Sequence, residues 1–167
     1  MTVVADSTPL IHLSRISDLT LLRKLFGGIL IPEAVQREVV IEGRSLPGAR
    51  QVSEAIGDWI EVVRVSDPVA ISSLIAERNL DRGEAEAIVL TQSRRADFLL
   101  MDERRAVACA RSLGLEVFRT LAIYDYAKRL GVIQKIRPKI DSLRRLGFWL
   151  SEKDYEDVLR TFAGDES

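Results

Sequence analysis

The sequence has very little cysteine or histidine, almost no net charge, and no long hydrophobic run. Its single cysteine, Cys109, excludes an internal disulfide and is typical of a reducing cytoplasm. Apolar runs such as Phe98–Met101 are too short to cross a bilayer, and the N-terminus lacks the basic and apolar stretches of a secretory signal. The overall net charge of -1 excludes a strongly basic nucleic-acid-binding protein, although a local basic patch remains compatible with this sequence.

The chain does have enough hydrophobic residues to form a compact core. It contains 167 residues, of which 47% are hydrophobic and 29% are charged, so a disordered or low-complexity chain is excluded. No linker rich in Gly, Ser or Pro divides it, and no repeat recurs at a fixed period. We therefore expect one domain over residues 1–167, with a helical extension over about residues 135–163.

Short β-branched runs alternate with segments of helical spacing. Such alternation predicts a parallel sheet covered by helices on both faces, a three-layer α/β fold, with ligand sites at the carboxyl ends of the strands near a topological switch point. The predicted strands cover residues 2–5, 29–31, 59–65, 98–101 and 116–119. The predicted helices begin at Ser7 and Pro32 and then cover about 49–56, 69–77, 81–95, 103–113, 121–130, 137–146 and 151–162.

Two aspartates directly follow predicted strands. Asp6 comes after the first strand and Asp102 after the fourth, so both lie on the edge where α/β sites are built. The alternative is that each caps the following helix, because Asp is a favoured N-cap residue. That alternative is weaker for Asp6, since Ser7 and Thr8 already supply capping hydroxyls.

Glu38 lies on the apolar face of the helix that begins at Pro32. Wound at about 100° per residue, that helix places Glu38 within the arc of Val35, Val39 and Ile41. A carboxylate on a buried face needs a partner, because removing an isolated charge from water is costly. The partner is either an arginine or a metal ion, and Glu38 alone favours the arginine.

The helix predicted over residues 81–95 is apolar nearly all round, which is typical of a central buried helix. Glu84 and Glu86 nevertheless lie in its first turn, beyond a capping Asp81. The helix dipole alone favours negative charge there. Periodicity does not decide which of the two glutamates points inward.

Four acids from four elements can thus converge on one end of the sheet: Asp6, Glu38, Glu84 and Asp102. Carboxylates clustered without His or Cys suit hard divalent cations such as Mg²⁺ or Mn²⁺. Without a metal they would repel one another and carry raised pKa values. Metal ions held in this way can activate a water and stabilise the leaving oxygen of a phosphodiester.

Five segments in this order and spacing resemble the PIN-domain family of metal-dependent ribonucleases, which includes VapC-type toxins, and most closely a PIN subfamily of prokaryotic proteins. The segments are Val4–Ile11, Ile31–Glu38, Gly83–Ile88, Leu99–Ala106 and Ala127–Ile133. The resemblance implies a five-stranded parallel sheet in the order 3-2-1-4-5, with Asp6 and Asp102 facing each other across the crevice.

The resemblance also implies a role for each site residue. Catalysis and the binding of Mg²⁺ or Mn²⁺ fall to the four acids, and substrate binding to the hydroxyls of Ser7, Thr8 and Thr120. The chain would be an endoribonuclease that hydrolyses RNA, the toxin of a type II toxin–antitoxin pair. Its partners would be RNA, a small antitoxin protein and a second copy of itself in a homodimer. We expect it in the cytoplasm, away from membranes.

Basic residues offer two routes for RNA to approach an acidic site. Arg104 and Arg105 directly follow Asp102 and are candidate phosphate contacts. Seven basic residues against one acid also lie between Lys128 and Arg145, either as a phosphate track or as a solvated helix face.

The remaining residues that could suggest chemistry are interpreted as structural. His12 is expected to be a structural or surface residue, and Cys109 to pack in the core. Trp59 and Trp149 are interpreted as core or interface anchors rather than as platforms for base stacking.

Two other functions stay open. The first is an inactive PIN scaffold that binds RNA or protein, although such a scaffold would be free to lose its four acids. The second is a phosphohydrolase of the HAD type, with Asp6 as the covalent nucleophile. That enzyme class needs a second Asp two residues further on, where this chain has Thr8.

Overall fold

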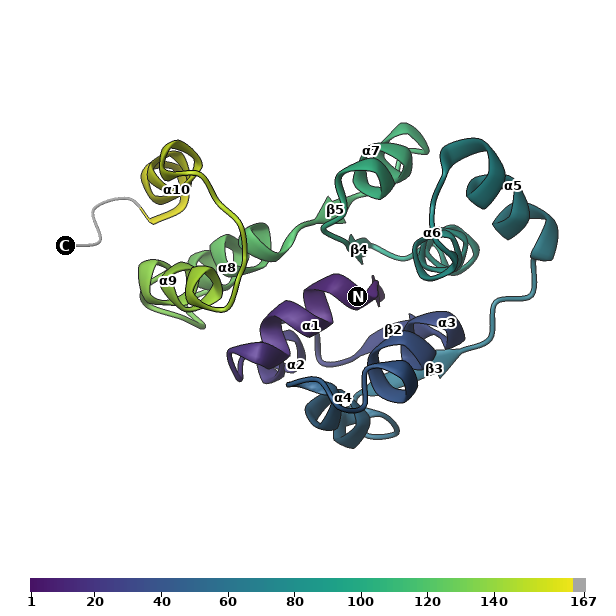
Figure 1. Cartoon of the computed structure of the whole chain (residues 1–167), viewed down its shortest axis with the longest axis horizontal. Coiled ribbons are helices and arrows are strands. Elements are labelled where there is room, and N and C mark those ends of the chain that lie inside the picture. Colours follow the sequence, from purple (N-terminus) through teal and green to yellow (C-terminus); the bar gives the residue numbers. More distant parts are fainter. Residues whose placement is uncertain (164–167) are drawn as a thin grey trace.

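A five-stranded sheet, all of it parallel, forms the centre of the molecule. The computed structural model describes residues 1–163. The strands lie in the order β3-β2-β1-β4-β5, which confirms the predicted α/β class and strand order (Figure 1). Their bounds are β1 Val3–Ala5, β2 Ile29–Pro32, β3 Ile60–Val63, β4 Phe98–Leu100 and β5 Val117–Phe118.

Apart from α2, which the sequence did not separate from the helix beginning at Ser7, the helices begin close to their predicted starts, and they cover both faces of the sheet. They are α1 Ser7–Arg15, α2 Thr20–Phe26, α3 Glu33–Gln36, α4 Ala49–Ala55, α5 Pro68–Arg78, α6 Arg82–Arg94, α7 Arg104–Ser112, α8 Thr120–Arg129, α9 Arg137–Arg145 and α10 Glu152–Val158. Two π-helical segments, η1 Arg37–Glu42 and η2 Leu159–Ala163, continue α3 and α10. No helix within residues 1–163 is long and apolar enough to span a membrane.

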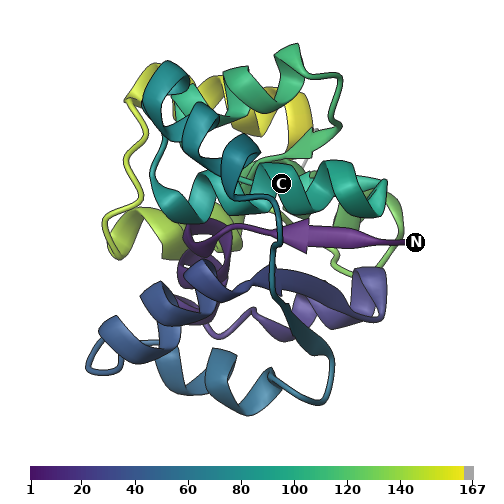
Figure 2. The same cartoon turned by 90° about the vertical axis from the view of Figure 1, so that its right-hand side faces the viewer.

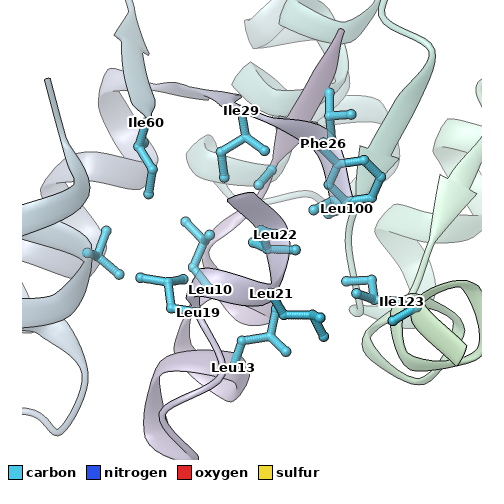
Figure 3. Packing of buried hydrophobic residues seen from close by; sticks show 14 of the residues in the cluster. Leu10, Leu13, Leu19, Leu21, Leu22, Phe26, Ile29, Ile60, Leu100 and Ile123 are labelled. Atoms are coloured by element: carbon cyan, nitrogen blue, oxygen red, sulfur yellow. The ribbon is translucent and has the colours of Figure 1, made fainter. Parts of the chain in front are cut away.

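Alternate strand residues feed two separate apolar cores. Ala5 and Leu100 point to one face, where they pack with side chains of α1, α2 and α8 (Figure 3). Val4 and Leu99 point to the other face, toward α6 and α7. In Figure 1 the first group of helices lies to the left of the sheet and α5 and α6 lie to the right. Figure 2, turned by 90°, shows β1 running between the two halves of the sheet and its helices.

The predicted central helix is confirmed as α6. Every residue from Gly83 to Thr91 is buried, including both glutamates of the first turn. One side of α6 contacts the sheet through Ala87 and Ile88, and the other contacts α5 through Ala85 and Val89. Its first turn is therefore held inside the protein at the edge where the strands end.

The sheet register aligns the ends of β1 and β4. Ala5 pairs with Leu100, and the N–H of Asp6 donates to the carbonyl of Leu100 at 2.9 Å. Asp6 and Asp102 therefore follow neighbouring parallel strands at the switch point, where the chain turns from one half of the sheet to the other.

The helix predicted from Pro32 to Ile41 differs from a regular α-helix. It widens into the π-helical η1, and the N–H of Gly43 donates to the carbonyl of Glu38 at 2.9 Å. A Cβ on Gly43 would lie 2.8 Å from the carbonyl oxygen of Val39, so the turn closes only around glycine. Since a π-turn rotates less per residue, the expected burial of Ile41 is wrong and its side chain is 56% exposed.

A buried tyrosine ties the C-terminal helices to the start of the chain. The Tyr124 hydroxyl donates to Oδ2 of Asp18 at 3.0 Å, and Nζ of Lys139 lies 2.8 Å from Oδ1 of the same carboxylate. Asp18 sits in the turn between α1 and α2, so one carboxylate joins that turn to α8 and α9.

Removing the Tyr124 hydroxyl should loosen this junction. We expect Tyr124→Phe to lower the free energy of unfolding by about 1.5 kcal/mol, because a buried hydrogen bond to a charged group is lost. The measurement is the midpoint of urea denaturation. Tyr126→Phe is the matched control, because Tyr126 packs among aromatic rings and its hydroxyl makes no hydrogen bond within residues 1–163. Equal midpoints for the two variants would contradict this role of Asp18.

Candidate active site

Asp6 is a buried carboxylate, and one of its two oxygens lacks a hydrogen-bond partner among the described residues. Only 2% of the residue is exposed, and the oxygen without a partner is Oδ1. It makes no capping hydrogen bond to α1, so the capping alternative is wrong for this residue. Burial and then the charges of Asp81, Glu84 and Glu38 raise its pKa from 3.8 to about 8, against the opposing N–H of Ser7.

Glu38 lies in the π-helical segment η1, and its carboxylate is close enough to Asp6 to contribute to the raised pKa of that residue. Burial raises the pKa of Glu38, and a hydrogen bond from the Ser7 hydroxyl opposes the rise. Within residues 1–163 it forms no ion pair with an arginine, so the expected arginine partner is wrong. Its carboxylate instead lies against α6, where a Cβ on Gly83 would be only 3.3 Å from Oε2.

Glu84 is fixed at the start of α6 by a reciprocal pair of hydrogen bonds. Its N–H donates to Oδ1 of Asp81 at 2.8 Å, and its Oε2 accepts from the N–H of Asp81 at 2.9 Å. Burial raises the pKa of Glu84, and the nearby charges of Asp81, Glu103 and Glu38 raise it further, while the N–H of Asp81 lowers it.

Glu86 is buried as well but is directed elsewhere. Its Oε2 accepts from the N–H of Ala34 at 3.1 Å, and its Oε1 accepts from Nε of Arg82 at 2.8 Å. It therefore caps the short helix α3. The structure places Glu84, rather than Glu86, among the acids that act on Asp6.

Asp81 joins these acids, although its sequence context indicated only a cap. Its charge contributes to the raised pKa of Asp6, Glu38 and Glu84 alike. The signal in the sequence was its position three residues before Glu84, where a capping box forces the two carboxylates together.

Asp102 belongs to a different set of contacts. Its Oδ1 accepts from the N–H of Thr120 at 2.8 Å, and its Oδ2 accepts from the Thr120 hydroxyl at 2.5 Å. Nδ1 of His12 lies 3.1 Å from the same Oδ2. Burial tends to raise the pKa of Asp102, but the hydrogen bonds of His12 and Thr120 outweigh it and hold the pKa below its usual value.

This arrangement settles two interpretations made from the sequence. Asp102 does not cap α7, because Glu103 does so with its own carboxylate, which accepts from the N–H groups of Arg105 and Ala106. His12 is a half-buried structural residue whose partner is a candidate catalytic acid. Its position on α1 beside the switch point was the available signal, but a lone histidine carries no periodicity that reveals a partner 90 residues away.

The candidate substrate-binding residues have different surroundings. Ser7 is buried against Glu38, and Thr8 is half-buried. Arg104 is exposed and lines a pocket together with Asp102. Arg105 donates through Nη1 to the carbonyl of Asn79 at 3.1 Å, and this contact engages one nitrogen of its guanidinium. Thr120 is fully buried and commits its hydroxyl to Asp102.

The carboxylate oxygens are chemically suited to a divalent cation, although, in the part of the chain that the structure describes, they do not lie close enough together to form a complete coordination site. Within residues 1–163, no three side chains of His, Cys, Asp or Glu approach one another closely enough to hold a metal ion. Asp6, Glu38 and Glu84 nevertheless supply only hard oxygen donors, and Oδ1 of Asp6 is buried without a partner. Such donors fit Mg²⁺ or Mn²⁺.

The comparison with known families agrees with the arrangement of the strands. A family model, DUF3368, described as a PIN domain, matches residues 2–163. The chain belongs to the PIN-domain family. PIN domains are generally nucleases, so the protein has a nuclease fold and the hydrolase class is supported. Among curated proteins, none matches the chain significantly.

The carboxylate of Asp6 should make the stability of this PIN domain depend on pH. Because its pKa rises from 3.8 to about 8 on folding, the folded protein holds the proton more tightly, and stability is lost as the pH rises between these values. In EDTA, Asp6→Asn should lose less stability than the wild type between pH 5 and pH 8, by at least about 3 °C in Tm.

Thermal unfolding with Mn²⁺ completes this test. The cation should raise the Tm of the wild type at pH 8 and leave Asp6→Asn nearly unchanged, because only the wild type offers the ionised carboxylate. Parallel pH curves for the two proteins in EDTA would show that Asp6 is not held in the buried position described above.

Proposed function

We propose that the protein is a metal-dependent endoribonuclease that hydrolyses phosphodiester bonds in RNA. The observation that carries the proposal is the unpartnered, buried Oδ1 of Asp6, next to Glu38 and Glu84 in a PIN-domain fold. A buried carboxylate costs free energy that packing alone does not return. A divalent cation offsets that cost by neutralising the cluster.

Asp6, Glu38 and Glu84 would hold Mg²⁺ or Mn²⁺, and Asp102 would complete the site from the neighbouring strand. When bound, such a cation lowers the pKa of a water and stabilises charge on the phosphoryl oxygens. The chain itself holds each acid in place: Ser7 fixes Glu38, Asp81 fixes Glu84, and Thr120 with His12 fixes Asp102.

The two groups of acids differ in their preferred protonation. The pKa of Asp102 is held below its usual value, so this carboxylate is ionised at neutral pH whether or not a cation is present. The pKa of Asp6, at about 8, means that a cation must displace a proton there near pH 7. Cation binding is therefore expected to strengthen as the pH rises toward 8.

The biological role proposed here rests on the resemblance to VapC-type toxins. We propose that the protein is the toxin of a type II toxin–antitoxin pair in the cytoplasm, blocked by a small antitoxin protein and assembled as a homodimer. A small antitoxin-like reading frame beside the gene, whose product suppresses toxicity on co-expression, is the observation that tests this role.

Cleavage of RNA by matched glutamate variants is the direct test of the nuclease. With Mn²⁺, the wild type should cleave a single-stranded RNA, and Asp6→Asn and Glu84→Gln should each reduce the rate by at least about 100-fold. Glu86→Gln is the control and should keep most of the activity, because Glu86 contacts Ala34 and Arg82 rather than Asp6.

Protein folding does not confound this comparison. Glutamine keeps an oxygen that accepts from the N–H of Asp81, so Glu84→Gln retains the capping box. Circular dichroism should therefore show a folded variant. Equal cleavage by the wild type and Asp6→Asn would reject the site. A wild type that stays inactive with Mn²⁺ would favour a scaffold that binds RNA or protein without cleaving it.

A further inference from the structure

A pocket of about 630 Å³ opens beside Asp102. Asp102 lines it from the end of β4, and Arg104 and Arg111 line it from α7. Arg119 lines it from the residue before α8, α8 itself contributes apolar side chains, and the segment of residues 148–162 supplies the remaining wall. The pocket therefore joins the edge of the sheet, where the acids lie, to the C-terminal helices.

The charge of this pocket favours an anion. Within residues 1–163, the guanidinium groups of Arg104 and Arg119 form no hydrogen bond and no ion pair, and that of Arg111 has only a 3.5 Å contact with the carbonyl of Val117. The two acids of the pocket have partners: Asp102 accepts from Thr120, and Asp154 accepts from the Ser151 hydroxyl at 2.7 Å. Positive charge is thus left available at the wall.

The basic run from Lys128 to Arg145 is a weaker candidate for binding RNA. Lys139 pairs with Asp18, and Arg129 pairs with Asp125. Arg144 pairs with Glu152, and its guanidinium lies 4.2 Å above the ring of Tyr155. Lys128, Lys135 and Arg137 have partners as well. Charges already engaged within the chain have less to offer to a phosphate backbone.

An exposed tryptophan lies at the same pocket. Trp149 is 81% exposed, so of the two predicted roles, core or interface anchor, the core role is wrong for this residue, whereas Trp59 is buried. Its neighbour Phe148 contacts the ring of His12 edge-on at 4.8 Å, and His12 contacts Asp102. The aromatic wall is therefore connected directly to the residues that position Asp102.

We propose that this pocket binds one nucleotide of a single-stranded RNA next to the acids of the site. Arg104 and Arg119 contact its phosphate, and Trp149 stacks on its base. An exposed indole beside unpaired arginines is the combination that proteins use to bind unpaired nucleotides. A base inside a duplex is already stacked on both sides, so the pocket selects single strands. This inference rests on the proposed nuclease function and adds the pocket and the residues that hold the substrate beside the acids.

Binding in EDTA tests the stacking residue without cleavage. The probe is a labelled single-stranded RNA of eight nucleotides, and the measurement is fluorescence anisotropy. Trp149→Ala should weaken binding by about 10-fold, since stacking on one base accounts for roughly 5- to 150-fold in affinity. Val69→Ala is the matched control, because Val69 is also an exposed apolar side chain but lies on α5, outside the pocket. This variant should bind RNA like the wild type.

Quenching of tryptophan fluorescence reports contact with the indole itself. The RNA should quench the emission that disappears in Trp149→Phe, because Trp59 is buried and contributes the remainder. The same sequence in a duplex should quench much less.

The salt dependence of binding tests the arginines. Arg104→Gln and Arg119→Gln should each reduce the slope of log K against log salt by about 0.7, which corresponds to one phosphate contact on a single strand. Arg64→Gln is the control, because Arg64 follows β3 at the opposite edge of the sheet and should leave the slope unchanged.

The outcomes separate this inference from the nuclease proposal. Loss of RNA binding in Trp149→Ala supports the pocket even when the wild type proves unable to cleave RNA. Wild-type affinity in Trp149→Ala, or equal quenching by duplex and single strand, overturns the inference even when the wild type cleaves. Quenching of Trp149 by a glutamate-rich peptide but not by RNA would also overturn it, and would assign the pocket to a protein partner.

Discussion

A carboxylate held out of water among other carboxylates is the constraint on which this site depends. Asp6 follows the central strand β1, and only 2% of the residue is exposed to solvent. The protein bears an electrostatic cost there, which appears as the strongly raised pKa of Asp6. Folding tolerates that cost because two large apolar cores, one on each face of the sheet, hold the surrounding elements together.

The neighbouring structure makes this concentration of charge possible. Glycine at position 83 lets the carboxylate of Glu38 approach α6, where a Cβ would crowd it. Glycine at position 43 lets the chain close the π-turn that carries Glu38. The capping box of α6 then brings Asp81 and Glu84 to the same place. Each device is local, but together they gather acids that come from separate parts of the chain.

Asp102, which follows the neighbouring strand β4, has a lowered pKa, whereas the pKa of Asp6 is raised. Hydrogen bonds from Thr120 and His12 stabilise the ionised form of Asp102, whereas Asp6, Glu38 and Glu84 have raised pKa values. A nuclease benefits from both kinds of acid, because one set needs a cation for neutralisation and the other stays ionised and fixed in orientation. His12 also connects Asp102 to Phe148, so the C-terminal segment participates in the site rather than only covering the core.

The strands and most helix starts could be anticipated from the sequence, because short β-branched runs mark buried strands and burial imposes a period of about 3.6 on helices. The order of the strands came from the resemblance to PIN domains. The ends of β1 and β4 then located Asp6 and Asp102. The apolar face of the helix from Pro32 indicated Glu38, the first turn of α6 left Glu84 and Glu86 open, and the resemblance to PIN domains chose Glu84 and added Thr120. Which glutamate faces Asp6, what holds Glu38, and how His12 reaches Asp102 were decided only by the tertiary structure. These features depend on side chains far apart in the chain, on a π-turn that alters the helical period, and on hydrogen bonds whose partners no local pattern can name.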